Sequence, residues 1–164
     1  MVELAIFRDD EGLELIDGGI VEMAPIGHRH GACVAQLNKR LVTDRALVWV
    51  HGVTRLAADS VLEPDLALLR PRSYRTGSPQ AADVLLVIAV AESSLHYDRT
   101  TKLGLYARGG VPEYWVVSVD GEWIAVYRSP EGDGYRERLR AGRGDAISPS
   151  TLGDVHIDVA ELFA

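Results

Sequence analysis

The run VLLVIAVA at residues 84–91 decides the fold of this chain, because all eight of its side chains are apolar. A strand with one face in water alternates between polar and apolar residues, whereas a strand covered on both faces does not. The run is far shorter than the roughly 20 residues of a membrane-spanning helix. We therefore expect a strand at the centre of a sheet, with a helix packed on each side.

Strands and helices alternate irregularly on both sides of this run. Upstream, the pattern predicts a hairpin over 13–24 with its turn at 17–19, a helix over 28–44, and strands over 46–56 and 66–69. Downstream, it predicts a helix from 97 or 98 to 108, a hairpin over 114–119 and 123–128, a strand over 135–139, and a terminal helix over 157–163. The fold class is thus α/β, in the mixed α+β sense, with a central mixed sheet flanked by helices.

Length and charge limit what the chain can be. Its 164 residues fit one domain, 1–164, around one core. The net charge of −7 is unusual for a protein that binds nucleic acid through phosphates, so such binding would need a local basic patch. Two groups of arginines could form one: residues 70, 72 and 75, and residues 136, 138, 140 and 143. The alternative is that these arginines are solvated surface charges.

Two features bear on where the protein works. The single cysteine, Cys33, excludes an internal disulfide and suits a reducing compartment. The start of the chain, MVEL, has neither the basic nor the apolar region of a secretory signal. We therefore expect a cytoplasmic protein without a membrane partner.

The residues with the clearest chemical potential lie on either side of the central strand. Asp65 follows Glu63 and Pro64 directly before the strand 66–69, and Lys102 lies on the helix after the central strand. Two carboxylates on adjacent strands can hold a divalent cation, and a nearby lysine can orient water or stabilise charge on a phosphate. A Pro-Asp pair before a strand also serves as ordinary turn structure.

A longer set of segments resembles one family. These segments are ELIDG at 14–18, PDLALL at 64–69, LLVIAVA at 85–91, YDR at 97–99 leading to Lys102, and YARGGVPEYW at 106–115. In this order they look like the Uma-type putative restriction endonuclease family, which is placed in the PD-(D/E)XK nuclease superfamily. The likeness spans about residues 13–128.

The resemblance implies a restriction-endonuclease-like fold, a Mg²⁺ or Mn²⁺ cofactor and DNA as the partner. It implies that Asp65 and the main-chain carbonyl of Val90 bind the metal, and that Lys102 and Glu14 are catalytic. His30 matches a polar position at the start of the first helix. Independently of the family, we expect His30 to make hydrogen bonds at that helix start.

The chain departs from the family pattern at Ala89, where the family has the glutamate that completes the metal site. Gly19 likewise replaces a common acid. A methyl group cannot bind a cation, so we expect weak metal binding unless Glu92 supplies the second carboxylate. Strand alternation, however, directs residue 92 to the face opposite residue 89.

Two functions therefore stay open. One is a metal-dependent DNA endonuclease, impaired by Ala89 or using Glu92. The other is a catalytically inactive nuclease-fold protein that binds nucleic acid or another protein. A homodimer is a further expectation, with the hairpin around residues 120–121 as a possible apolar edge.

Overall fold

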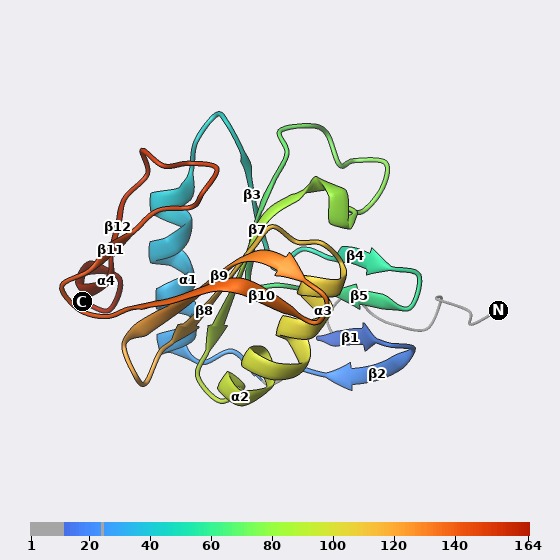
Figure 1. The fold of residues 1–164 in the computed structure, drawn as a ribbon, viewed down its shortest axis with the longest axis horizontal. Coiled ribbons are helices and arrows are strands. Elements are labelled where there is room, and N and C mark those ends of the chain that lie inside the picture. The colour runs from blue at the N-terminus through green and yellow to red at the C-terminus, as the bar shows by residue number, and fades with distance from the viewer. Residues whose placement is uncertain (1–11, 24) are drawn as a thin grey trace.

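The computed structural model describes residues 12–23 and 25–164, and a six-stranded mixed sheet lies at its centre (Figure 1). The strands of this sheet are β3 (Leu47–Val50), β6 (Leu66–Leu69), β7 (Val84–Ala91), β8 (Glu113–Ser118), β9 (Trp123–Glu131) and β10 (Gly134–Ala141). They lie in the order β10-β9-β8-β7-β6-β3, and β7–β8 is the parallel pair. The predicted central strand and the mixed sheet are confirmed.

Helices cover both faces of this sheet. Helix α1 (His28–Leu41) lies on one face, where its Leu37 and Leu41 share a core with Leu86 and Ile88 of β7. On the other face the chain runs through α2 (Leu95–Tyr97), one π-helical turn (Asp98–Lys102) and α3 (Leu103–Arg108). Successive residues of β7 thus point into two different cores, which is why the whole run is apolar.

A smaller sheet beside the first carries the N-terminal hairpin. Its strands are β1 (Leu13–Ile16), β2 (Gly19–Glu22), β4 (Thr54–Ala57) and β5 (Ser60–Leu62), in the order β2-β1-β5-β4. The hairpin turn is confirmed: Asp17 and Gly18 both have positive φ, 48° and 79°, as a two-residue hairpin turn of type I′ requires. Residue 24, the predicted end of this hairpin, lies outside the described residues.

Three predicted elements have different bounds. Helix α1 ends at Leu41 rather than at residue 44. The strand predicted over 46–56 is two strands in different sheets, because the chain turns at His51, which has a φ of 48°. The terminal helix over 157–163 begins as a strand, β12 (Ile157–Asp158), which pairs with β11 (Ala146–Ile147) before α4 (Val159–Leu162).

The hairpin around residues 120–121 does not form an edge. Its strands β8 and β9 lie inside the large sheet, between β7 and β10, so it does not offer the dimer edge that the sequence indicated. The edges of this sheet are β3 and β10. Among the described residues, no helix has the length and apolar character needed to cross a membrane.

A buried carboxylate fastens the sheet to the C-terminal segment. Glu113 of β8 is 1% exposed, and its Oε1 accepts hydrogen bonds from Trp115 Nε1 and Arg128 Nε, each at 2.8 Å. Its Oε2 accepts from the backbone N–H of Ser150 at 2.8 Å. By contrast, the ion pair of Glu131 and Arg136 at the end of β9 is mostly exposed on both sides.

We predict that Glu113→Ala lowers the free energy of unfolding by about 3 kcal/mol, because it leaves the partly buried Arg128 without its carboxylate. The matched change Glu131→Ala should cost less than about 1 kcal/mol, since exposed ion pairs contribute little. Urea denaturation of both variants measures the difference. Equal losses in the two variants would contradict this account of Glu113.

Candidate active site

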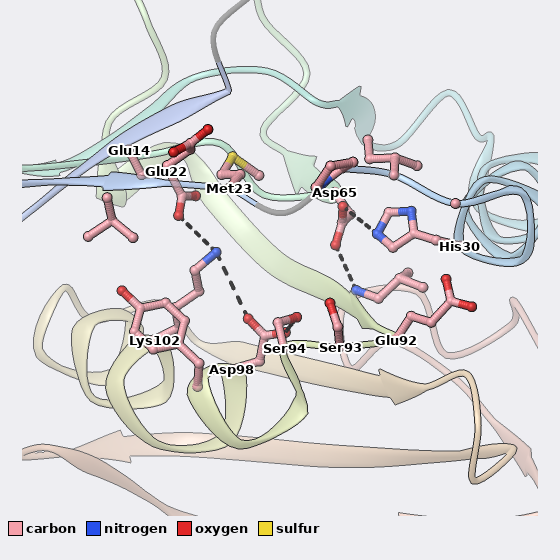
Figure 2. Close-up of a pocket in the computed structure, with 16 residues that line it drawn as sticks. Glu14, Glu22, Met23, His30, Asp65, Glu92, Ser93, Ser94, Asp98 and Lys102 are labelled. Atoms are coloured by element: carbon pink, nitrogen blue, oxygen red, sulfur yellow. Dashed lines mark hydrogen bonds and ion pairs between the residues drawn. The ribbon is translucent and has the colours of Figure 1, made fainter.

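A pocket of about 450 Å³ opens where β1–β2, the start of α1, the ends of β6 and β7, and the helix after β7 meet (Figure 2). All five residues singled out from the sequence line it: Glu14, Asp65, Val90, Glu92 and Lys102. Asp65 and Lys102 therefore share one pocket, although they come from opposite sides of β7 in the chain.

Asp65 is held in place by the end of β7. The backbone N–H of Val90 donates to Asp65 Oδ2 at 2.7 Å, and this contact follows from the antiparallel pairing of β6 with β7. The other oxygen, Oδ1, lies 3.0 Å from His30 Nε2 and 3.8 Å from His51 Nδ1. Both carboxylate oxygens of Asp65 thus face nitrogen atoms of the protein.

His30 reaches Asp65 from the first turn of α1. Its hydrogen bond to Asp65 raises the pKa of the imidazole above the ordinary 6.5, and burial opposes this rise only in part. The predicted hydrogen bond of His30 at the helix start is present, but its partner is Asp65: Gly27 is the N-cap of α1, and no side chain caps that end. The imidazole is instead turned into the pocket wall, beside the carboxylate (Figure 2).

Lys102 lies among carboxylates at the opposite side of the pocket. Its Nζ is 2.9 Å from Glu14 Oε2 and 3.9 Å from Asp98 Oδ1, and all three side chains are at most 12% exposed. Burial lowers the pKa of Lys102, but attraction to Glu14 and Asp98 outweighs it, so the pKa lies above its usual value. Lys102 is therefore a fixed cation, and it is poorly suited to act as a base.

Asp98 and Glu14 are themselves held by further hydrogen bonds. Burial raises the pKa of Asp98, while the hydroxyl of Ser94, which donates to Oδ2 at 2.6 Å, opposes that rise. Glu14 Oε1 accepts the backbone N–H of Glu63 at 3.0 Å. The lysine and its two acids thus form a buried, hydrogen-bonded group that links the small sheet to the helix after β7.

Glu92 extends from the end of β7 toward α1, as strand alternation predicts. It lies 3.4 Å from Arg29 Nη1, which makes a shorter contact of 2.7 Å with Asp120. Because β7 ends at Ala91, Glu92 still lines the pocket. It lies on the α1 side of the pocket, near His30 (Figure 2).

Ala89 occupies the position next to Asp65 on the neighbouring strand. Leu66 pairs with Ile88, so the same antiparallel register continued by one residue places Asp65 opposite Ala89. Directly opposite residues of an antiparallel pair point to the same face, with Cβ atoms about 5 Å apart. A carboxylate at residue 89 would therefore lie beside that of Asp65, whereas the methyl group of Ala89 belongs to the apolar core under α3.

The residues that the structure describes do not form a preformed metal site. Within residues 12–23 and 25–164, no three His, Cys, Asp or Glu side chains are grouped so that they could hold a metal ion. The one carboxylate at the expected position, Asp65, already accepts a hydrogen bond on one oxygen and faces two imidazoles on the other. A hard cation such as Mg²⁺ needs several oxygen ligands in near-octahedral geometry.

Sequence reasoning gave no role to Asp98 or His51, and it named His30 without its partner. Asp98 was part of the family pattern but received no role, although its i, i+4 spacing from Lys102 on a helix favours an ion pair. The contacts of His30 and His51 with Asp65 join residues 35 and 14 positions apart in the sequence, and no local pattern marks them.

Comparison with known proteins agrees with this fold. A family model described as Uma2, putative restriction endonuclease, matches residues 1–160. The crystal structure of a putative nuclease belonging to DUF820 from Anabaena variabilis is similar, with a TM-score of 0.73 and 18% sequence identity; the match covers 96% of this chain and 93% of that one. No curated protein sequence matches the chain. The nuclease-like fold expected from the sequence is thus confirmed.

The contact between His30 and Asp65 makes a testable prediction. In the unmodified protein, an NMR titration should give His30 a pKa above 6.5. Asp65→Asn should lower that pKa, because it removes the charge-assisted hydrogen bond and leaves the burial, which disfavours the imidazolium. Asp120→Asn is the control, since Asp120 pairs with Arg29. A His30 titration that Asp65→Asn leaves unchanged would disprove the assignment.

Proposed function

Because the chain belongs to the Uma2 family of putative restriction endonucleases, we propose that it acts on DNA through this pocket and that Ala89 impairs its metal-dependent cleavage of phosphodiesters. The observation that carries the proposal is the pairing of Leu66 with Ile88, because this antiparallel register, continued by one residue, places Ala89 opposite Asp65. The other candidates, Glu14, Asp65, Val90, Glu92 and Lys102, all line the pocket, and Gly19 is the second departure from the family pattern.

The charge of the pocket supports a role for a cation. Five carboxylates line it, those of Glu14, Glu22, Asp65, Glu92 and Asp98, against one ammonium group and one imidazole. A phosphodiester entering this pocket would meet mostly negative charge. A divalent cation, when bound, supplies the positive charge that polarises a phosphate and activates water. Without a second carboxylate beside Asp65, such a cation would bind weakly.

The residues of the chain itself then have distinct roles. Lys102, held protonated by Glu14 and Asp98, would balance negative charge on the phosphate. Asp65 and the carbonyl of Val90 would contribute oxygen ligands. Glu14 would act as a positioning residue, since its contact is with Lys102 and with the backbone of Glu63.

A restored carboxylate tests the proposal directly. We predict that Ala89→Glu binds Mn²⁺ at least about tenfold more tightly than the unmodified protein, which corresponds to ~1.4 kcal/mol. It should also show a cation-dependent rise in melting temperature and should nick supercoiled plasmid with Mg²⁺ or Mn²⁺. Lys102→Ala in the same background should remove the nicking while keeping the Mn²⁺ affinity.

Ser93→Glu is the matched control, because it adds the same side chain at an exposed position of the pocket rim. If Ser93→Glu gains as much metal binding as Ala89→Glu, added negative charge alone explains the effect, and the role assigned to residue 89 is wrong. If the glutamate side chain does not fit at this buried position, Ala89→Asp, with its shorter side chain, replaces Ala89→Glu in the test.

A second candidate function, an active endonuclease that uses Glu92, is favoured by one observation. Glu92 lines the pocket and is held loosely, since Arg29 lies closer to Asp120 than to Glu92. If this candidate is right, the unmodified protein should cleave plasmid with Mn²⁺, and Glu92→Gln should reduce the rate at least about 100-fold, or ~2.7 kcal/mol. Glu22→Gln, another carboxylate on the pocket wall, is the control. Cleavage that Glu22→Gln and Glu92→Gln reduce equally would rule the candidate out.

A further inference from the structure

Two arginines lie against one indole ring on the face of the sheet that carries α3. The guanidinium carbon of Arg140 is 4.2 Å from the ring centre of Trp123, and that of Arg99 is 5.4 Å from the same ring. Arg99 also donates from Nε to the hydroxyl of Tyr127 at 3.3 Å. Both arginines are exposed, whereas Trp123 beneath them is only 9% exposed. The indole thus brings two like charges together at the surface.

A third arginine continues this group along β10. Arg138 pairs with Tyr127 and Arg140 with Ala125, and both partners belong to the apolar core under α3. Because paired residues of an antiparallel ladder share a face, Arg138 and Arg140 project on the α3 side of the sheet. Two positions along a strand are about 7 Å apart. Helix α3 packs against β9 and β10 (Figure 1). Arg138 and Arg140 therefore project from the face of the sheet that α3 covers.

Carboxylates near this group in the chain have other partners. Glu137, next to Arg138, accepts a hydrogen bond from the hydroxyl of Ser129 at 3.3 Å, and three further carboxylates pair with other arginines. Glu131 pairs with Arg136, Asp133 with Arg108, and Glu122 with Arg143. Within residues 12–23 and 25–164, Arg99, Arg138 and Arg140 form no ion pair with a carboxylate. In a chain with a net charge of −7, three uncompensated cations on one face are a local exception.

The group adjoins the pocket. Arg99 lies on the same π-helical turn as Asp98 and Lys102, which line the pocket, and it points instead toward the sheet. A long anion that contacts Arg138, Arg140 and Arg99 in turn is therefore led to the pocket rim. Guanidinium groups bind phosphate oxygens in a planar, two-point geometry, which suits this task.

We propose that Arg99, Arg138 and Arg140, arranged around Trp123, form the surface that binds the phosphate backbone of DNA and leads it to the pocket. The choice of DNA as the ligand rests on the proposed function. An anionic membrane is a poorer match, because a flat negative surface on this face would also meet the carboxylates of the pocket rim.

The test measures binding in EDTA, so that no metal and no cleavage are involved. Fluorescence anisotropy of a labelled DNA duplex is followed against salt concentration for the unmodified protein and for Arg99→Gln/Arg140→Gln. The double variant should bind at least tenfold more weakly, and the slope of log K against log salt should become shallower by about 2, one per lost phosphate contact.

Arg136→Gln/Arg143→Gln is the matched control, because it removes the same net charge from arginines that already have carboxylate partners. It should keep the affinity and slope of the unmodified protein. If loss of packing on Trp123 unfolds the double variant, Arg138→Gln replaces it in the test. Arg138→Gln should make the slope of log K against log salt shallower by about 1.

Several results would overturn the inference: no duplex binding by the unmodified protein, equal weakening in the control pair, or arginine-dependent binding of phosphatidylglycerol vesicles without binding of the duplex. Failure of the binding surface and failure of the proposed function give different results. If Ala89→Glu nicks plasmid and its affinity for DNA does not depend on Arg99 and Arg140, only the binding surface is wrong. If duplex binding depends on these arginines but Ala89→Glu gains no metal affinity, only the account of residue 89 is wrong.

Discussion

The hydrogen bond from the backbone N–H of Val90 to Asp65 is the contact on which the site depends. It ties the residue before β6 to the end of β7, at 2.7 Å, where the ladder between the two strands stops. An N–H at the end of a ladder needs a partner, and a carboxylate is a strong one. This bond fixes Asp65 against the strand that carries Ala89, and so determines which side chains can surround it. Strand register therefore sets the position of Asp65 in the pocket, and the charges around it are arranged second.

Once Asp65 is fixed, the buried ionisable groups of the pocket pair with one another, although carboxylates still outnumber the cations. Lys102 offsets Glu14 and Asp98 on one side, and His30 offsets Asp65 on the other. Buried charges are costly unless they are paired and hydrogen-bonded, so this arrangement lets the pocket fold without an added cation. It also has a chemical consequence. A metal ion that approaches Asp65 must compete with an imidazole whose pKa that carboxylate raises.

The sequence predicted the sheet better than it predicted the site. The apolar run at residues 84–91 and the glycine turn at residue 18 have direct local causes, namely burial on both faces and positive φ, so the central strand and the first hairpin were found. The break at His51 was missed because histidine, although enriched at positive φ relative to other residues, still adopts that conformation only rarely, so the residue alone does not predict a turn. The His30–Asp65 contact was missed because it depends on how α1 lies on the sheet, which no single segment encodes.

The same distinction limits what the overall charge says about partners. A net charge of −7 argues against binding to polyanions, but it is an average over the whole chain. Of the four arginines at residues 136–143, two are neutralised by neighbouring carboxylates, and Arg138 and Arg140 are left on the face that carries Arg99. Strand alternation and local ion pairs, rather than the count of charges, decide which arginines can meet a phosphate. Because electrostatic attraction is screened within about 10 Å at moderate salt, a local surface of this kind can bind an anion even on an acidic protein.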